Sequence, residues 1–102
     1  MDNLDRISIL AENSRVCVDA LEKTLVANNF KPSKKTYADI DVDGEITVKE
    51  NNDFAIYIQI SIYKPMYIIN KYDKKEEVFY TLVDLNNIKE VIDYLRSKIW
   101  NQ

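Results

Sequence analysis

The chain has 102 residues, of which 46% are apolar, and its net charge is −3. This length is typical of one domain spanning residues 1–102, and no segment reaches the roughly 20 apolar residues of a membrane-spanning helix. The absence of histidine and the single Cys17 exclude Ser-His-Asp catalysis, Cys-His catalysis and a multi-thiolate zinc site, and the acidic balance argues against duplex nucleic acid as a partner.

Residues 4–29 are predicted to form one long helix. Their apolar side chains recur at spacings of three, four or seven residues, which places them along one stripe. Asn28-Asn29 offers a left-handed stop, and Pro32 prevents the helix from continuing. Cys17 lies on the stripe, where a buried thiol is expected, because the chain has no histidine to activate it as a nucleophile.

The segment between residues 36 and 83 changes to the two-residue period of β-strands. Its breaks are too short for crossover helices, so neighbouring strands should pair antiparallel in a meander. The sheet has five strands if Lys64-Pro65 forms a turn, and four if that break is a bulge. The predicted strands are Tyr37–Asp41, Glu45–Lys49, Phe54–Tyr63, Met66–Tyr72 and Val78–Val83.

A second helix is predicted over residues 86–99, and Asp84 or Asn86 would cap its start. Its apolar positions share one face: Ile88, Val91, Ile92, Leu95 and Ile99. Because each helix has a single apolar stripe, both helices should cover the same face of the sheet. The predicted fold is therefore a two-layer α+β domain with an N-terminal helix, a four- to five-stranded antiparallel sheet and a C-terminal helix.

Residues 39–50 match the pattern of an EF-hand calcium loop, with acids at the ligand positions and Gly44 at the turn. The oxygen ligands would be Asp39, Asp41, Asp43 and Glu50. An EF-hand needs a helix on each side of its loop, whereas Pro32 shortens any helix before this segment and the residues after it are strand-like. We therefore expect no cofactor, with Ca²⁺ as the alternative.

A β-hairpin explains the same segment. A three-residue loop, Val42-Asp43-Gly44, pairs Ile40 with Ile46 and Asp41 with Glu45, so that apolar residues share one face and acids share the other. A two-residue loop would instead place acids against the core. The sequence therefore predicts the hairpin with the three-residue loop.

The other face of the predicted sheet carries tyrosines. In the segment 54–63, one parity is apolar and faces the core, while the other parity contains Tyr57 and Tyr63. Tyr67 and either Phe79 or Tyr80 would extend this face. Tyrosine is enriched at protein interfaces because it supplies rigid area and a hydroxyl group. The predicted partner-binding residues are Tyr57, Tyr63, Tyr67 and Tyr80.

These features favour a small non-enzymatic protein-binding module whose partner is another protein or a second copy of the chain. Abundant Ile, Asn, Lys and Tyr have A/T-rich codons, so the more specific hypothesis is an inhibitor or adaptor that a phage or mobile element encodes against a host protein. Single-stranded nucleic acid stacking on the tyrosines is a further alternative, but only Lys49, Lys64 and Lys71 would supply positive charge. The lone cysteine and the absence of a secretory leader indicate the cytoplasm.

Overall fold

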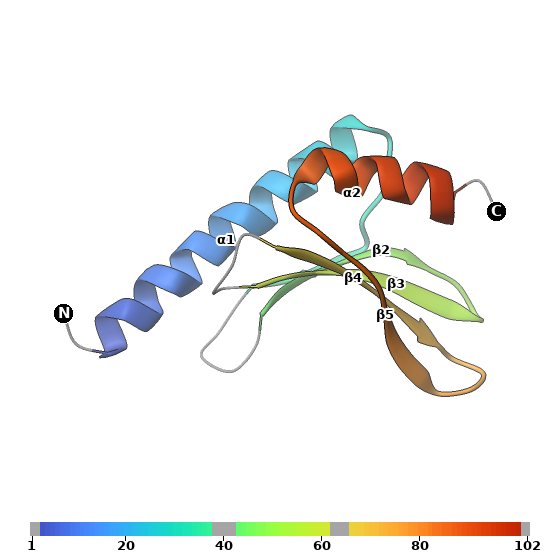
Figure 1. Ribbon diagram of the computed structural model, residues 1–102, viewed down its shortest axis with the longest axis horizontal. Helices are drawn as coiled ribbons and strands as arrows, with labels where there is room; N and C mark the ends of the chain where they lie inside the picture. The colour runs from blue at the N-terminus through green and yellow to red at the C-terminus, as the bar shows by residue number, and fades with distance from the viewer. Residues whose placement is uncertain (1–2, 38–42, 62–65, 101–102) are drawn as a thin grey trace.

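The structure is a computed structural model that describes residues 3–37, 43–61 and 66–100. A helix, a five-stranded sheet and a second helix follow one another, and both helices lie on the same face of the sheet (Figure 1). The predicted two-layer α+β fold is confirmed. The elements are α1 (Asn3–Ala27), β1 (Lys34–Thr36), β2 (Gly44–Glu50), β3 (Phe54–Ile60), β4 (Tyr67–Asp73), β5 (Val78–Leu85), α2 (Ile88–Tyr94) and the π-helix η1 (Leu95–Ile99).

The five strands form an antiparallel meander in the order β1-β2-β3-β4-β5, as predicted. Because β3 and β4 are separate paired strands, the four-stranded alternative with a bulge between them is wrong. β3 supplies the centre of the sheet, and its positions Ile56, Ile58 and Ile60 are buried against the helices. The alternation in this segment therefore predicted the core face correctly.

The first strand differs from its prediction. β1 covers Lys34–Thr36 rather than Tyr37–Asp41, and it pairs Lys35 with Ile46 and Thr36 with Glu45. The predicted three-residue loop is wrong, because it would pair those two β2 residues with Ile40 and Asp41. Residues 38–42 lie outside the described part of the chain.

Contacts with α1 account for this register. The ammonium group of Lys35 lies 3.3 Å from a carboxylate oxygen of Asp19 and 3.0 Å from one of Glu22. The next residue, Tyr37, donates a hydrogen bond from its hydroxyl to Asp19 at 2.6 Å, and this bond lowers the pKa of the Asp19 carboxyl. These polar contacts join β1 and the residue after it to positions of α1 that lie 13 to 18 residues earlier in the chain, so no local pattern reveals them.

The core lies between the sheet and both helices. α1 contributes residues at the predicted helical spacing, and α2 with η1 contributes the face that its apolar pattern predicted. The partly buried Cys17 packs beside them, on the predicted stripe. The fully or nearly fully buried apolar side chains in this cluster are Val18, Leu21, Leu25, Phe30, Ile46, Val48, Ile56, Ile58, Ile60, Ile69, Val91, Ile92 and Leu95.

The end of α1 follows its sequence signal. Asn29 adopts a left-handed conformation with φ of 70°, and the N–H group of Phe30 donates to the Leu25 carbonyl at 3.0 Å. The buried Phe30 ring then meets Trp100 edge to face, with 4.8 Å between ring centroids. Arg96 also donates to the side chain of Asn28 at 2.9 Å, which ties the end of α1 to η1.

The cap of α2 was predicted one or more residues too early. Asn87 caps the helix, because its side-chain oxygen accepts the backbone N–H of Glu90 at 2.9 Å. The Glu90 carboxylate in turn accepts the N–H of Asn86, the residue before the cap, at 3.1 Å, so that the helix start is held by side-chain bonds in both directions. Neither Asp84 nor Asn86 is the cap, because β5 continues to Leu85 before the helix begins.

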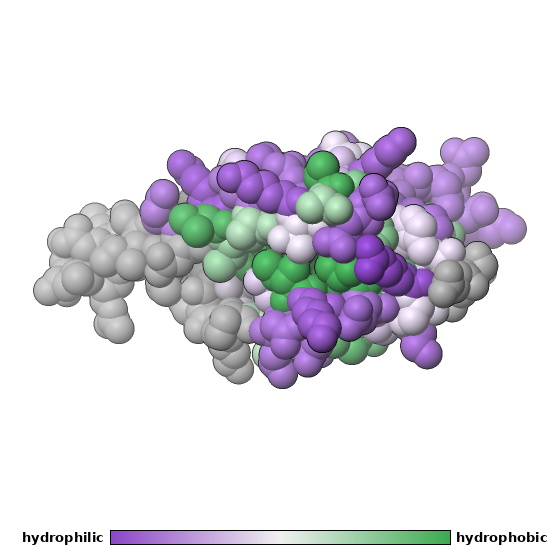
Figure 2. Space-filling model, turned by 90° about the horizontal axis from the view of Figure 1, so that it is seen from above, coloured by the Kyte–Doolittle hydropathy of each residue, from purple (hydrophilic) through white to green (hydrophobic). Residues whose placement is uncertain are grey.

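Seen from the helix side, an apolar hollow is bordered by hydrophilic side chains (Figure 2). A cavity of about 380 Å³ separates α1 from α2, and Ile88 and Ile92 are its apolar lining. Among the described residues, no helix is both long enough and apolar enough to span a membrane. The helix layer therefore covers the core of the sheet and leaves a hollow between its two helices.

Candidate binding surfaces

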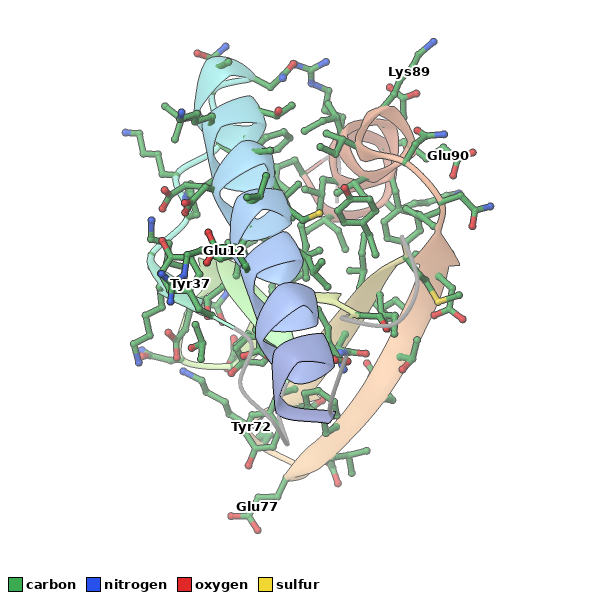
Figure 3. The ribbon with its side chains drawn as sticks, turned by 90° about the vertical axis from the view of Figure 1, so that its left-hand side faces the viewer. Glu12, Tyr37, Tyr72, Glu77, Lys89 and Glu90 are labelled. Atoms are coloured by element: carbon green, nitrogen blue, oxygen red, sulfur yellow. The ribbon has the colours of Figure 1, made fainter. Side chains whose placement is uncertain are left out.

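The sheet has a second face that the helices do not cover, and we call it the open face. It carries Tyr57 from β3, Tyr72 from β4 and Phe79 from β5. Tyr72 and Phe79 are cross-strand partners, and cross-strand partners point to the same face of a sheet. The rings of Tyr57 and Phe79 lie 6.1 Å apart between centroids. Figure 3 shows Tyr72 at the lower end of the molecule, away from the start of α2. The open face thus has an aromatic cluster near one end.

The four predicted tyrosines do not share this face. Tyr57 lies on it, but Tyr67 packs against the core on the helix side, where burial raises its pKa. Tyr80 is the partner of Lys71, whose side chain also lies on the helix side, so its predicted place is wrong as well. Tyr63 lies outside the described residues. Tyr72 takes the place expected for Tyr67, and of the two alternatives on β5 it is Phe79 that lies on the open face.

The buried Ile69 is the signal that locates these residues correctly. It faces the core, so Tyr67 and Lys71, at two residues before and after it, face the core side as well. The sequence obscures this parity because Ile68 and Ile69 are adjacent and equally apolar. On β5, Leu82 is an extra residue opposite the β4 register shift, so the strand parity changes within the strand.

A ladder of side-chain hydrogen bonds crosses the open face. Gln59 donates to Asp43 at 2.8 Å, and Asn70 donates to Gln59 at 3.1 Å. Thr81 donates its hydroxyl hydrogen to the Asn70 side-chain oxygen at 2.9 Å. Asn70 is only 1% exposed, so its amide depends on these partners. Sequence reasoning missed this ladder, because only the strand register brings the four side chains together.

Glu45 gives this region a pH dependence. Burial raises the pKa of its carboxyl above the usual 4.5, so the folded state binds the proton more tightly than the unfolded state. The associated stability is present below the unfolded pKa and is lost as pH rises through the folded pKa. We expect Glu45→Gln to raise the thermal midpoint at neutral pH and to leave it nearly unchanged near pH 3. Thermal unfolding at both pH values, followed by circular dichroism, tests this, and a lower midpoint at neutral pH would contradict it.

The EF-hand interpretation of residues 39–50 is wrong. Asp43 immediately precedes β2 and Glu50 ends it, so the rise of an extended strand separates them by about 20 Å. A single Ca²⁺ holds its oxygen ligands at about 2.3–2.6 Å, which these two carboxylates cannot both reach. Glu50 instead binds the Lys74 ammonium group at 2.9 Å, which lowers the pKa of its carboxyl. Asp39 and Asp41 lie outside the described residues.

One edge of the sheet is long and apolar. Among the described residues, no strand pairs with the outer edge of β5, and the first three residues of β5 are exposed: Val78 by 48%, Phe79 by 55% and Tyr80 by 40%. The opposite edge, β1, has only three residues, two of which are lysines. Short, charged edges resist pairing with another chain, whereas β5 has no lysine and no proline to block it.

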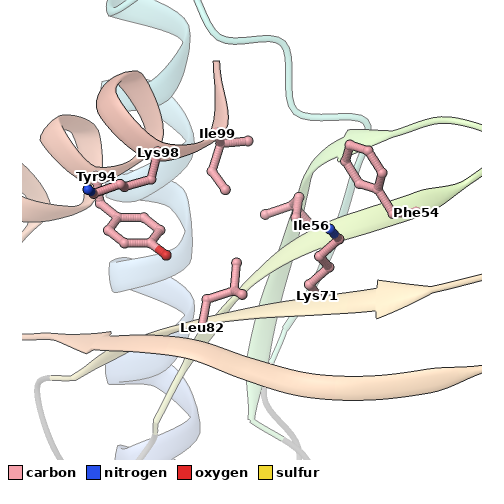
Figure 4. A pocket seen from close by; sticks show the side chains of 7 residues that line it. All are labelled: Phe54, Ile56, Lys71, Leu82, Tyr94, Lys98 and Ile99. Atoms are coloured by element: carbon pink, nitrogen blue, oxygen red, sulfur yellow. The ribbon is translucent and has the colours of Figure 1, made fainter. Parts of the chain in front are cut away.

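A crevice of about 320 Å³ opens on the helix side, between the C-terminal helix and the sheet (Figure 4). The helix contributes a phenol ring, an aliphatic side chain and a lysine, while β3, β4 and β5 contribute the floor. Most of its walls are apolar, with an ammonium group from each side of the crevice. The lining residues are Phe54, Ile56, Lys71, Leu82, Tyr94, Lys98 and Ile99.

Comparisons with protein-family models, with curated proteins and with solved structures give no match for this chain. Within the described residues, no group of three or more acidic, cysteine or histidine side chains gathers in a way that could hold a metal ion. A function must therefore be argued from the β5 edge, the open face and the crevice themselves.

Proposed function

We propose that this chain is a small non-enzymatic protein-binding module that contacts its partner through the edge of β5. The observation that carries the proposal is the run of exposed apolar side chains from Val78 to Tyr80 on the outermost of the described strands at this edge. An exposed edge offers backbone N–H and C=O groups to an extended segment of another protein, and alternate side chains then give specificity.

Aromatic side chains of the open face lie next to the β5 edge and would take part in the same contact. Phe79 lies on the open face beside Tyr57, whereas Val78 and Tyr80 alternate to the other face of the strand. A strand of the partner that pairs with β5 would therefore find apolar side chains of β5 on both faces of the extended sheet. Aromatic side chains of this kind are enriched at the centres of protein interfaces. An inhibitor or adaptor role against a host protein is the more specific form of this proposal, and it rests on composition.

Charge favours a protein over single-stranded nucleic acid. The open face carries Glu45 and Asp84 on its strands, with Glu50 at the end of β2. Lys49 and Lys71, which were expected to supply phosphate contacts, approach the Phe54 ring and so lie on the helix side. A base stacked on Tyr57 would therefore bring its phosphates close to Glu45 and Glu50. Of the lysines on this side, Lys34 and Lys74, the second is already paired with Glu50.

Val78→Lys tests the edge, because lysine is the side chain that natural edge strands use against pairing. We expect it to weaken partner binding at least about tenfold through the loss of one buried apolar contact. The matched control is Val26→Lys on α1, where the valine is 59% exposed and far from β5 in sequence. Proteins captured by each variant from the encoding organism are identified, and their affinities are then measured by calorimetry.

A partner that binds the wild type and Val26→Lys, but not Val78→Lys, supports the proposal. Equal binding by all three proteins would place the interface elsewhere. Light scattering of the same three proteins shows whether the partner is a second copy of the chain, since self-pairing through β5 would give a dimer that Val78→Lys converts to monomer.

A further inference from the structure

Three lysines surround the crevice between the C-terminal helix and the sheet. The Lys71 ammonium group lies 4.8 Å from the centroid of the Phe54 ring, and that of Lys49 lies 5.7 Å from the same centroid. Lys49 also lies 5.0 Å from the Trp100 ring, beside the crevice, and Lys98 lines it from η1. Positive charge from β2 and β4 therefore gathers beside the Phe54 ring, in a chain whose net charge is negative, while the Lys98 ammonium group lies beside Tyr94 at the other side of the crevice (Figure 4).

These lysines form no ion pair among the described residues. The ion pairs there join Lys35 to α1 and Lys74 to Glu50. The nearest carboxylate in the sheet register is Asp73, the partner of Phe54, and one of its oxygens accepts the backbone N–H groups of the following turn. Like charges that share one ring repel each other, and a bound anion would relieve that repulsion more strongly than an exposed cation–π contact does.

A strand irregularity is the reason Lys49 reaches this place. Val48 is an extra residue in β2 at the register shift, so Val48 is buried and Lys49 still faces the helix side as the partner of Ile56. A regular strand would have turned Lys49 to the open face. Bulges of this kind commonly re-aim a side chain beside a functional site.

We propose that the crevice binds a small amphipathic carboxylate, with the carboxylate beside Lys49 and Lys71 and the apolar part against the walls. Ile56, Leu82 and Ile99 supply an aliphatic lining, and Figure 4 shows the hydroxyl of Tyr94 directed from the helix toward the sheet. The volume of about 320 Å³ is at the small end of ligand sites, which suits a medium-chain fatty acid or a molecule of similar size. This site lies on the helix side and is independent of the proposed protein contact at the β5 edge.

The probe is decanoate, and the readout is the fluorescence of Trp100, the only tryptophan of the chain. Trp100 is 38% exposed and lies beside Lys49, so an anion bound at the lysines should change its emission. We expect a saturable change with decanoate below its micelle concentration. Decanol lacks the charge and should bind at least about tenfold more weakly than decanoate. Inorganic phosphate lacks the apolar part and should also bind at least about tenfold more weakly.

Two variants and a matched control locate the site. Lys71→Met and Lys49→Met keep most of the apolar stem and remove the charge, so each should weaken decanoate binding about tenfold. Lys89→Met removes an exposed charge from the other hollow, between α1 and α2, and should leave binding unchanged. Calorimetry gives the affinities independently of Trp100, and circular dichroism verifies that each variant is folded.

The absence of saturable binding by the folded wild type would overturn the proposal. Equal weakening by Lys71→Met and Lys89→Met would do so as well, since a general loss of positive charge would then explain the result. Decanoate affinity that is unchanged in Val78→Lys would distinguish this site from the β5 edge.

Discussion

Replacing Ile58 with alanine is expected to lower the free energy of unfolding by about 2–5 kcal/mol, the range for truncating a buried isoleucine. Ile58 is fully buried in the central strand β3, with Ile46 on one neighbouring strand and Ile69 on the other as its cross-strand partners. The two helices close the core above it, so neighbouring side chains have little freedom to fill the cavity. Urea unfolding followed by far-UV circular dichroism measures the change.

Val26→Ala on α1 is the control for this truncation. Val26 is 59% exposed, and alanine favours a helix, so its stability should change by no more than about 0.5 kcal/mol and in the stabilising direction. Equal losses in the two variants would mean that β3 does not lie at the centre of the core. A large loss confined to Ile58→Ala agrees with both helices packing on this face.

Replacing Asn70 with alanine is the second large effect, and we expect it to cost about 2–3 kcal/mol. Asn70 is almost completely buried, and its amide both donates to Gln59 and accepts from Thr81. Alanine removes these bonds and leaves the Gln59 side chain, which is partly buried, without one of its partners. The same urea experiment provides the measurement.

A double-mutant cycle separates the ladder from simple loss of volume. Thr81→Val preserves the shape of the side chain and removes only its hydroxyl donor to Asn70. The two residues should be coupled by about 0.5–1.5 kcal/mol, so the double variant should lose less stability than the single losses together imply. Strict additivity would show that the Thr81–Asn70 hydrogen bond contributes nothing to folding.

The two proposed surfaces share β5 but use different parts of it. Val78 to Tyr80 form the exposed edge, whereas Leu82 belongs to the floor of the crevice. Decanoate affinity and partner affinity can therefore be measured on the same two variants, Lys71→Met for the crevice and Val78→Lys for the edge. Because neither substitution removes a core side chain, loss of one activity alone would show that the sites act separately.

Sequence reasoning found the aromatic character of the open face, placed Tyr57 on it correctly, and offered Phe79 as one of two alternatives for β5. Tyr67 and Tyr80 were assigned to the wrong face because the adjacent Ile68 and Ile69 concealed the parity of β4, and the extra Leu82 changed the parity of β5. The edge run from Val78 to Tyr80 was visible as a strand, yet the sequence did not indicate that none of the described strands would pair with its outer side.

The local pattern of side chains by itself determined the helices, four of the five strands and the apolar face that the helices and β3 bury. Periods of about 3.6 and two residues decide which side chains share a face, and burial of that face supplies most of the stabilisation. Only the tertiary structure decided the place of β1, where Lys35 and Tyr37 bind Asp19 on α1. It also decided the bulges, because an extra residue in a strand is stabilised by packing against neighbouring strands and helices. The bulge in β2 is what brings Lys49 beside the crevice, so that site exists only in the folded chain.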